Sequence, residues 1–328
     1  MALRSWLQIP PRSPFSIANI PFGIISTSAV QTPHPAVAIG EYALDLQVFA
    51  AGNGFAALSI IQPHQNAFSS STLNAFASLG KPIHSAVRKY LQSVLLEGGP
   101  FPHILKDNED LRQEALVPLK DVKYHLPMAI GDYTDFFAGM HHAHKMGTLF
   151  RGAANALNPN YKHLPVGYHG RASSVVISGT PIGRPNGQIM LNPAAESKQP
   201  VFSACRKLDI ELELGAFLCK SNPMGQPIAI DEAHEYIFGL TLLNDWSARD
   251  IQTWEYVPLG PFNAKNFGTT VSPWIVLTEA LEPFRTKALQ NDTQILPYLK
   301  EVEESNVYNM ELEIDLKGMY RALRLIIV

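Results

Sequence analysis

The chain has 328 residues and a formal net charge of -3, with 46% hydrophobic and 17% charged residues. This composition is that of an ordinary folded protein with one large domain or two moderate ones, and it excludes a largely disordered chain. We see no clustered basic face, so the sequence gives no support to binding of nucleic acid or of an anionic membrane.

Cysteine usage and the N-terminal residues favour a cytoplasmic protein. Cys205 and Cys219 are too few for a disulfide framework and lack CxxC spacing, which suits a reducing compartment and argues against a structural zinc site. No apolar run approaches the ~20 residues of a membrane span. The opening MALRSWLQIPPRSPF has prolines where a signal peptide needs its apolar core. A transit peptide is the weaker alternative, because the acid-free first 40 residues carry only Arg4 and Arg12 as charges.

The first third of the chain reads as a small domain, which we place at residues 1–125. Residues 36–46 (AVAIGEYALDL) hold two short apolar runs around Gly40, as in a β-hairpin. A helix is then predicted from Pro82 in its first turn to Gly98 and Gly99 at its end. Its core face carries apolar residues at helical spacing, namely Ile83, Val87, Leu91 and Val94.

From residue 126 to residue 328 we expect a second, β-rich domain, because short strand-like segments alternate there with Gly/Pro/Asn turns. Residues 236–243 (YIFGLTLL) form a nearly continuous apolar run, which predicts a strand buried on both faces. The predicted fold class is therefore mostly β with some α.

Alternating acids mark the segment LDIELEL. In a strand, Asp209, Glu211 and Glu213 share one face, with neighbouring carboxylates about 7 Å apart. On a solvated face this arrangement costs little, whereas in a cleft it requires a cation. The same pattern recurs in residues 310–316 (MELEIDL), so alternation alone favours the solvated face.

Two further acids stand just after apolar segments. Asp245 ends the run YIFGLTLLN, where a charge leaving a buried strand must be paired, capped or bound to metal. Ser247 and Asp250 form a predicted capping box for the following helix, which leaves Asp245 free of that role. Asp135 in GDYTDFF follows another predicted strand end, although loop aspartates commonly make turns only.

If these acids converge, their ligand set is all oxygen. Oxygen ligands select calcium or magnesium over zinc or copper, which indicates a hydrolase metal. The alternative is an iron site, in which two histidines of HHAH (residues 141–144) act with a carboxylate. Surface or core histidines explain HHAH more simply.

Cationic residues follow in two nearby segments. In SARDIQTWEY, Arg249, Gln252 and Tyr256 fall on one side of a predicted short helix and could receive a carboxylate or carbonyl group, although an exposed amphipathic helix has the same spacing. Lys265 precedes Gly268, Thr269 and Thr270, whose small and hydroxylated side chains allow oxygen atoms to approach an ion.

Five motifs resemble the fumarylacetoacetase family in order and spacing: GDYTDFF, LFRGAANALNPNYKHLPVGYHGRASS, LDIELE, NDWSARDIQTWEYVPLGPF and NFGTTVSPW. The resemblance runs from about Ser16 to Lys317. It implies a small N-terminal SH3-like barrel, a larger mixed β-roll domain and a homodimer. The implied reaction splits the β-diketo acid fumarylacetoacetate into fumarate and acetoacetate in tyrosine and phenylalanine breakdown.

The resemblance also assigns roles to individual residues. A calcium site is implied at four acids: Asp135, Glu211, Glu213 and Asp245. A magnesium site is implied at Asp245 with Lys265 and Thr269, where the lysine contributes its backbone carbonyl or only lies nearby. His142 resembles the base that activates water, and Arg249 with Lys265 the cationic pair that stabilises developing negative charge. Substrate contacts are implied at four residues: Arg151, Tyr168, Gln252 and Tyr256.

The sequence departs from the family pattern in two places. Phe137 stands where the family usually has a tyrosine that contacts substrate, so we expect weaker binding. After LKG the chain reads MYRALRLIIV, whereas the family continues for about a further quarter of its length with a carboxylate that orients the histidine and a threonine that contacts substrate. We therefore expect a truncated chain with little activity. The alternatives are an acylpyruvate hydrolase, a keto-acid decarboxylase, or a metal-binding remnant without turnover.

Overall fold

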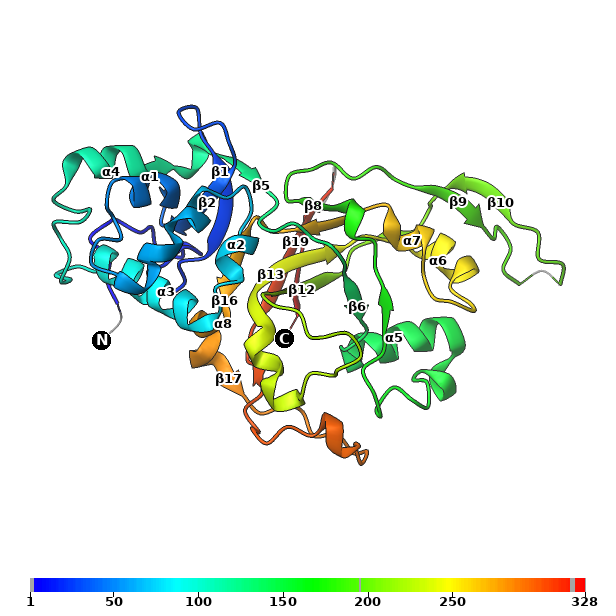
Figure 1. Cartoon of the computed structure of the whole chain (residues 1–328). Coiled ribbons are helices and arrows are strands. Elements are labelled where there is room, and N and C mark those ends of the chain that lie inside the picture. Colours follow the sequence, from blue (N-terminus) through cyan, green and yellow to red (C-terminus); the bar gives the residue numbers. More distant parts are fainter. Residues whose placement is uncertain (1–2, 195, 319–321, 328) are drawn as a thin grey trace.

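The computed structural model describes residues 3–194, 196–318 and 322–327 (Figure 1). Its strands are β1 Phe22–Ser26, β2 His34–Ile39, β3 Tyr42–Asp45, β4 Leu116–Pro118, β5 Lys123–His125, β6 Thr134–Phe136, β7 Gly167–His169, β8 Val175–Ile177, β9 Asn186–Ile189, β10 Val201–Ala204, β11 Leu208–Asp209, β12 Leu212–Leu218, β13 Ile237–Asp245, β14 Ser247–Ala248, β15 Thr269–Val271, β16 Trp274–Leu277, β17 Arg285–Thr286, β18 Val307–Tyr308, β19 Leu312–Lys317 and β20 Ala322–Ile327. Its α-helices are α1 Leu46–Ala51, α2 Asn74–Ala77, α3 Lys81–Leu95, α4 Glu109–Ala115, α5 Met140–Arg151, α6 Arg249–Glu255, α7 Asn263–Asn266 and α8 Thr278–Leu281.

One large sheet organises the molecule, and the predicted mostly β fold with some α-helix is confirmed. Within the described residues this sheet has 10 strands, in the order β4-β3-β2-β1-β16-β13-β15-β8, with β5 beside β1 and β12 beside β13. Strand β1 pairs antiparallel with β16, Phe22 lying opposite Ile275, so the N-terminal and later strands meet at this pair (Figure 1). The sheet thus crosses the boundary that we predicted after residue 125, and the division into two domains stays a prediction.

The elements predicted in the first third are confirmed. Strands β2 and β3 form the hairpin, and Gly40 between them has φ +59°, a conformation that glycine adopts without steric cost. Helix α3 has Pro82 in its first turn and ends at Leu95, three residues before the predicted Gly98. Its predicted core residues Val87 and Leu91 are fully buried.

An aromatic core holds strand β13 in place. Phe22 stacks on Phe76 with ring centroids 5.2 Å apart, and Phe238 of β13 meets Phe76 edge-on at 5.9 Å. Phe238 is 2% exposed. Because this end of β13 is anchored in the core, the opposite end of the strand, at Asp245, has a defined position.

The strand predicted at residues 236–243 is confirmed, but the prediction that it is buried on both faces along its whole length is wrong. Phe238 is 2% exposed near the start of β13, whereas Leu242 is 51% exposed near its end. Leu214, opposite Leu242 on β12, is also 40% exposed. The core that covers Phe238 does not extend along the whole strand in the described residues, so an apolar run overestimates burial here.

Candidate active site

Three acids from separate strands meet at the end of β13. Carboxylate oxygens of Asp135, Glu213 and Asp245 all lie within 4.8 Å of one another. Asp245 closes β13 and is fully buried, and Glu213 on β12 lies opposite Leu243, two residues before Asp245. This diagonal position brings the two side chains within reach of each other across the strand pair. Figure 1 shows β6, which carries Asp135, beside these strands.

Asp135 is fixed by its partner on the neighbouring strand. Strand β6 pairs with β7 so that Asp135 lies directly opposite Tyr168. The Tyr168 hydroxyl donates to Asp135 Oδ2 at 2.7 Å, and Asp135 is 8% exposed. Tyr168, predicted to contact substrate, therefore also orients one of the three acids.

The electrostatics of this group suit a cation. Burial raises the pKa of Glu213 to about 8, and the negative charges of Asp135, Glu211 and Asp245 act in the same direction. Burial also raises the pKa of Asp245, although the ammonium group of Lys265 opposes the shift. Buried like charges repel, and oxygen donors at this spacing match a hard divalent cation. The residues present thus fit a metal ion.

Glu211 does not belong to this group of three, although the sequence pattern placed it with Glu213. Its Oε1 atom accepts from Arg249 Nη2 at 2.6 Å and lies 3.1 Å from His142 Nε2. Its Oε2 atom accepts from Lys265 Nζ. Burial works to raise the pKa of Glu211, but the hydrogen bond from His142 and the charges of Lys265 and Arg249 lower it well below its ordinary value.

Lys265 links the two sets of acids. It lies on α7, is 6% exposed, and donates to Asp245 Oδ2 at 2.5 Å as well as to Glu211. Asp245 Oδ1 also accepts from the Thr269 hydroxyl at 3.4 Å. Strand pairing explains this contact, because Thr269 on β15 lies opposite Asp245. The side-chain amine of Lys265 acts here as a cation among acids.

Arg249 is held from three sides. Its guanidinium donates to Asp209 Oδ2 at 2.9 Å and to Gln252 Oε1 at 3.0 Å, in addition to Glu211. The helical spacing of Arg249 and Gln252 predicted their contact on one side of α6. Tyr256 follows α6, and its ring centroid lies 6.0 Å from that of Phe150 on α5. Helices α5 and α6 therefore approach each other beside the acids.

His142 lies on α5 and is more accessible than the acids. Its side chain is 44% exposed, and the ring of Phe137 stands nearly perpendicular to it, with centroids 5.6 Å apart. Phe137 thus packs against the imidazole without offering a hydroxyl group. No histidine belongs to the group of acids suited to a metal among the described residues, which gives no support to the iron alternative.

Arg151 does not reach the acids through its hydrogen bonds. At the end of α5, its Nε atom donates to the carbonyl of Asn155 at 3.0 Å and its Nη2 atom to that of Ala156 at 2.7 Å. These bonds hold the turn after the helix. Of the four predicted substrate contacts, Tyr168 bonds to Asp135 and Gln252 to Arg249. Tyr256 lies beside Phe150, and the Arg151 guanidinium is bonded to backbone carbonyls.

The predicted capping box at Ser247 and Asp250 is wrong. The Ser247 hydroxyl donates to the Asp245 carbonyl at 3.1 Å, and Asp250 accepts from the backbone N–H of Arg206 at 2.7 Å. Ser247 belongs to β14, which pairs with β11, so a strand occupies the position where sequence reasoning placed a helix cap. Asp245 still has no capping role, because its carboxylate is bound to Lys265 and Thr269.

The two segments with alternating acids, LDIELEL and MELEIDL, lie in different environments. LDIELEL is divided between β11 and β12, and its Glu211 and Glu213 enter the site. In the second segment, Glu311, Glu313 and Asp315 are exposed on or beside β19. The prediction of a solvated face is therefore confirmed for MELEIDL only.

Sequence reasoning missed Tyr133 as a neighbour of the acids. Burial raises the pKa of its phenol, and the negative charges of Asp245 and Asp135 act in the same direction. The ring also fills the space beside Gly170, where a Cβ atom would lie 2.2 Å from Tyr133. Its position two residues before Asp135 was the available signal, because alternate residues of a strand share a face.

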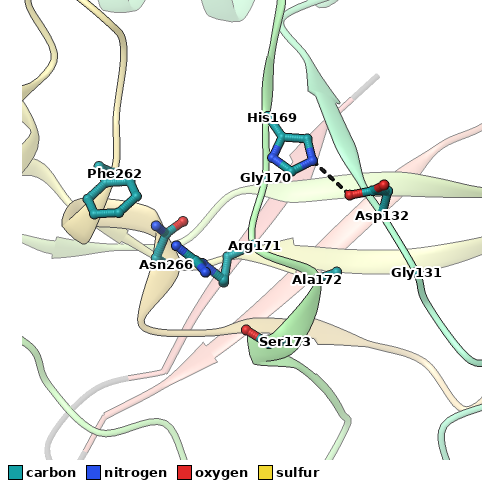
Figure 2. A pocket seen from close by; sticks show the side chains of 9 residues that line it. All are labelled: Gly131, Asp132, His169, Gly170, Arg171, Ala172, Ser173, Phe262 and Asn266. Carbon is teal, nitrogen blue, oxygen red and sulfur yellow. Dashed lines mark hydrogen bonds and ion pairs between the residues drawn. The ribbon is translucent and has the colours of Figure 1, made fainter.

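A hollow of about 300 Å³ lies beside the site. Figure 2 shows its wall, where His169 Nε2 and Asp132 Oδ1 lie 2.8 Å apart and Arg171 lies near Phe262 and Asn266. His169 follows Tyr168 and Asn266 follows Lys265. The same two elements, β7 and α7, therefore contribute side chains both to the acid cluster and to the hollow.

Comparison with known proteins identifies both halves of the chain. The protein-family model "Fumarylacetoacetase N-terminal" matches residues 18–127 of the sequence, and the family model "Fumarylacetoacetate (FAA) hydrolase C-terminal" matches residues 133–316. Fumarylacetoacetase from Aspergillus fumigatus is 64% identical over 316 residues, covering 96% of this chain and 73% of that protein. The Homo sapiens fumarylacetoacetase is 46% identical over 314 residues, with the same coverage.

A solved structure of a related enzyme resembles this chain only weakly. The fumarylacetoacetate hydrolase from Exiguobacterium antarcticum aligns over 80% of this chain and 68% of its own length, with a TM-score of 0.42 and 16% identity. This similarity is too low to inform the site.

In the described part of the chain, no helix combines the length and apolar character that crossing a bilayer requires.

Proposed function

Because the chain belongs to the fumarylacetoacetase family, we propose that it hydrolyses the carbon–carbon bond of fumarylacetoacetate to give fumarate and acetoacetate. One observation carries this proposal beyond the likeness of sequence. Three acids able to hold a metal, of which Asp135 and Asp245 are buried and Glu213 is half-buried, lie close together. Beside them, Glu211 bonds to both Lys265 and His142. The arrangement combines a cation site, a base and fixed positive charges.

Asp135, Glu213 and Asp245 hold a divalent metal ion in this proposal. Their ligand atoms are all oxygen, which favours calcium or magnesium. Glu211 supplies negative charge nearby or a fourth ligand, and Lys265 and Thr269 surround Asp245. When bound, the ion polarises the diketo group of the substrate.

His142 acts as the base that activates water. Its Nε2 atom faces Glu211, so Nδ1 is left to accept a proton from a water molecule. The hydroxide adds to the ketone carbon and remains with it as the carboxyl group of fumarate. The electron pair of the broken carbon–carbon bond goes to acetoacetate as an enolate, and the proton held by His142 returns to that carbon.

Arg249 and Lys265 stabilise the negative charge that develops during these steps. Both cations are already fixed by acids, so little reorganisation is needed as the charge forms. Tyr168, Gln252 and Tyr256 orient the substrate. Arg151 joins them only if its guanidinium leaves the backbone carbonyls that it now binds.

The biological setting follows from the same proposal. The protein is a homodimer that acts in tyrosine and phenylalanine breakdown in the cytoplasm. Two cysteines support a reducing compartment, since both Cys205 and Cys219 are free thiols and intracellular proteins rarely depend on disulfides.

Loss of diketone absorbance on adding fumarylacetoacetate to the purified chain tests the proposal. We expect low but measurable turnover that calcium or magnesium restores after chelation. His142→Asn is expected to lower kcat by about 10²- to 10⁴-fold, the usual contribution of a general base. His144→Asn, on the same helix, is the matched control and is expected to retain activity.

A substrate panel separates the alternatives. Faster hydrolysis of a simple acylpyruvate than of fumarylacetoacetate would favour the related hydrolase, and carbon dioxide release from a keto acid would favour the decarboxylase. Calcium binding by calorimetry without turnover of any substrate would contradict the proposed enzyme and support a metal-binding remnant.

A further inference from the structure

Glu255 connects the helix that carries Arg249 with the helix that carries Lys265. It is the last residue of α6. Its Oε1 atom accepts from the backbone N–H groups of Phe262 at 2.8 Å and Ala264 at 2.7 Å, and its Oε2 atom accepts from that of Asn263 at 3.1 Å. A single carboxylate therefore binds three consecutive backbone donors at the start of α7.

Helix α7 needs such an acceptor from outside its own sequence. The first backbone N–H groups of a helix have no partner within it, and a polar N-cap side chain usually supplies one. Here the N-cap residue is Phe262, which makes no side-chain capping bond. Glu255 provides the missing acceptors from seven to nine residues earlier in the chain.

The position of α7 determines where the Lys265 amine lies. Lys265 comes directly after Ala264 and is 6% exposed. Its amine bonds to Glu211 and Asp245, so a shift of the first turn of α7 would change both contacts. Arg249, at the other end of α6, bonds to the same Glu211. Glu255 thus links the backbones that carry the two cations.

We propose that Glu255 is a positioning residue, which sets the placement of Lys265 relative to Arg249 for the hydrolysis proposed above. The inference rests on that proposed function for its consequence in catalysis. The role is indirect, because the hydrogen bonds of the Glu255 carboxylate go to backbone groups of α7.

Steady-state kinetics of Glu255→Gln and Glu255→Ala give the first test. Since small displacements in an active site cost up to about 10²-fold, we expect kcat to fall roughly 10- to 100-fold with KM within about threefold of the unchanged protein. The glutamine variant keeps one acceptor oxygen and is expected to lose less. Calcium binding measured by calorimetry should persist, because none of the three acids is replaced, but its affinity should shift because Lys265 bonds to Asp245.

Asn108→Ala is the matched control. Asn108 caps α4 by accepting from the backbone N–H of Leu111 at 3.2 Å, so its loss removes a helix cap away from the acids. This variant is expected to lose some thermal stability and retain its kcat. An equal fall in kcat for Asn108→Ala and Glu255→Ala would show a general effect of lost stability and would overturn the positioning role.

Amine labelling separates this inference from the proposed function. An acylating reagent and mass spectrometry report the labelling rate of Lys265 without any turnover. We expect the rate to rise several-fold in Glu255→Ala and not in Asn108→Ala, with faster amide hydrogen exchange at residues 262–264. If the unchanged protein fails to hydrolyse fumarylacetoacetate, labelling still decides whether Glu255 positions Lys265. Labelling and exchange equal to those of the unchanged protein would refute the role.

Discussion

Lys265 and Asp245 form a buried ion pair, with Nζ 2.5 Å from Oδ2 and side chains 6% and 0% exposed. The surrounding charges explain why this pair suits a metal site. The four acids Asp135, Glu211, Glu213 and Asp245 carry four formal negative charges when ionised, and Lys265 and Arg249 supply two positive charges. Asp209 also pairs with Arg249, so the acids outnumber the two cations and leave a net negative charge that a divalent ion would offset.

Replacing Lys265 by methionine should lower both stability and activity. Removing one partner of a buried ion pair costs about 3 kcal/mol in free energy of unfolding, since Asp245 and Glu211 would lose their shared cation. We expect kcat to fall about 10²- to 10³-fold, as when one stabilising donor is removed. Denaturant unfolding and steady-state kinetics measure the two effects. Lys120→Met, at an exposed lysine, is the control and should change neither.

The pKa of Glu213 predicts how metal binding and stability depend on pH. Burial, with the charges of Asp135, Glu211 and Asp245, raises this pKa from 4.5 to about 8. Between these values the folded protein retains a proton that the unfolded chain loses, so the contribution of Glu213 to the metal-free stability falls as pH rises. A divalent ion binds the deprotonated form, and its affinity should therefore increase over the same range.

Thermal unfolding at about pH 5.5 and pH 8, with a chelator or with excess calcium, measures this linkage. The stabilisation by calcium should be larger at the higher pH. Glu213→Gln should reduce this pH dependence, and Asp245, whose pKa burial also raises to about 7, should account for the remainder. Glu311→Gln, at an exposed acid, should preserve it in full. Equal stabilisation at both pH values would contradict the assignment.

Tyr168→Phe should weaken metal binding. The Tyr168 hydroxyl donates to Asp135, and loss of a group that orients a metal ligand typically costs about 10- to 100-fold in affinity. Calorimetry with calcium measures the change. Tyr161→Phe is the matched control, because the buried Tyr161 hydroxyl has no hydrogen-bond partner in the described part of the protein. A comparable loss of affinity in both variants would exclude a specific role for Tyr168.

Phe137→Tyr should improve substrate binding. The added hydroxyl would stand beside His142, whose ring Phe137 already contacts, at the position where the resemblance implies a tyrosine that contacts substrate. One new hydrogen bond of about 1 kcal/mol would lower KM roughly fivefold, with little change in kcat. Phe136→Tyr, at a 56% exposed residue, should have no effect on KM. A fall in kcat would show instead that the hydroxyl disturbs His142.

Local sequence patterns predicted the elements whose stability depends on nearby residues. The hairpin around Gly40 and helix α3 are recognisable because turn chemistry and apolar spacing act over a few positions. Patterns failed where tertiary contacts compete with local ones. Ser247 and Asp250 have the spacing of a capping box, but Ser247 lies in a strand that pairs with β11.

The sequence by itself determined which acids were available and that their oxygens would favour a hard cation. Only the tertiary structure decided which acids share a site. LDIELEL and MELEIDL have the same alternation, yet Glu213 meets Asp135 and Asp245 whereas Glu313 lies on an exposed surface. The physical reason is that a carboxylate's pKa and metal affinity depend on burial and on charges brought from distant segments, and strand pairing between those segments sets both.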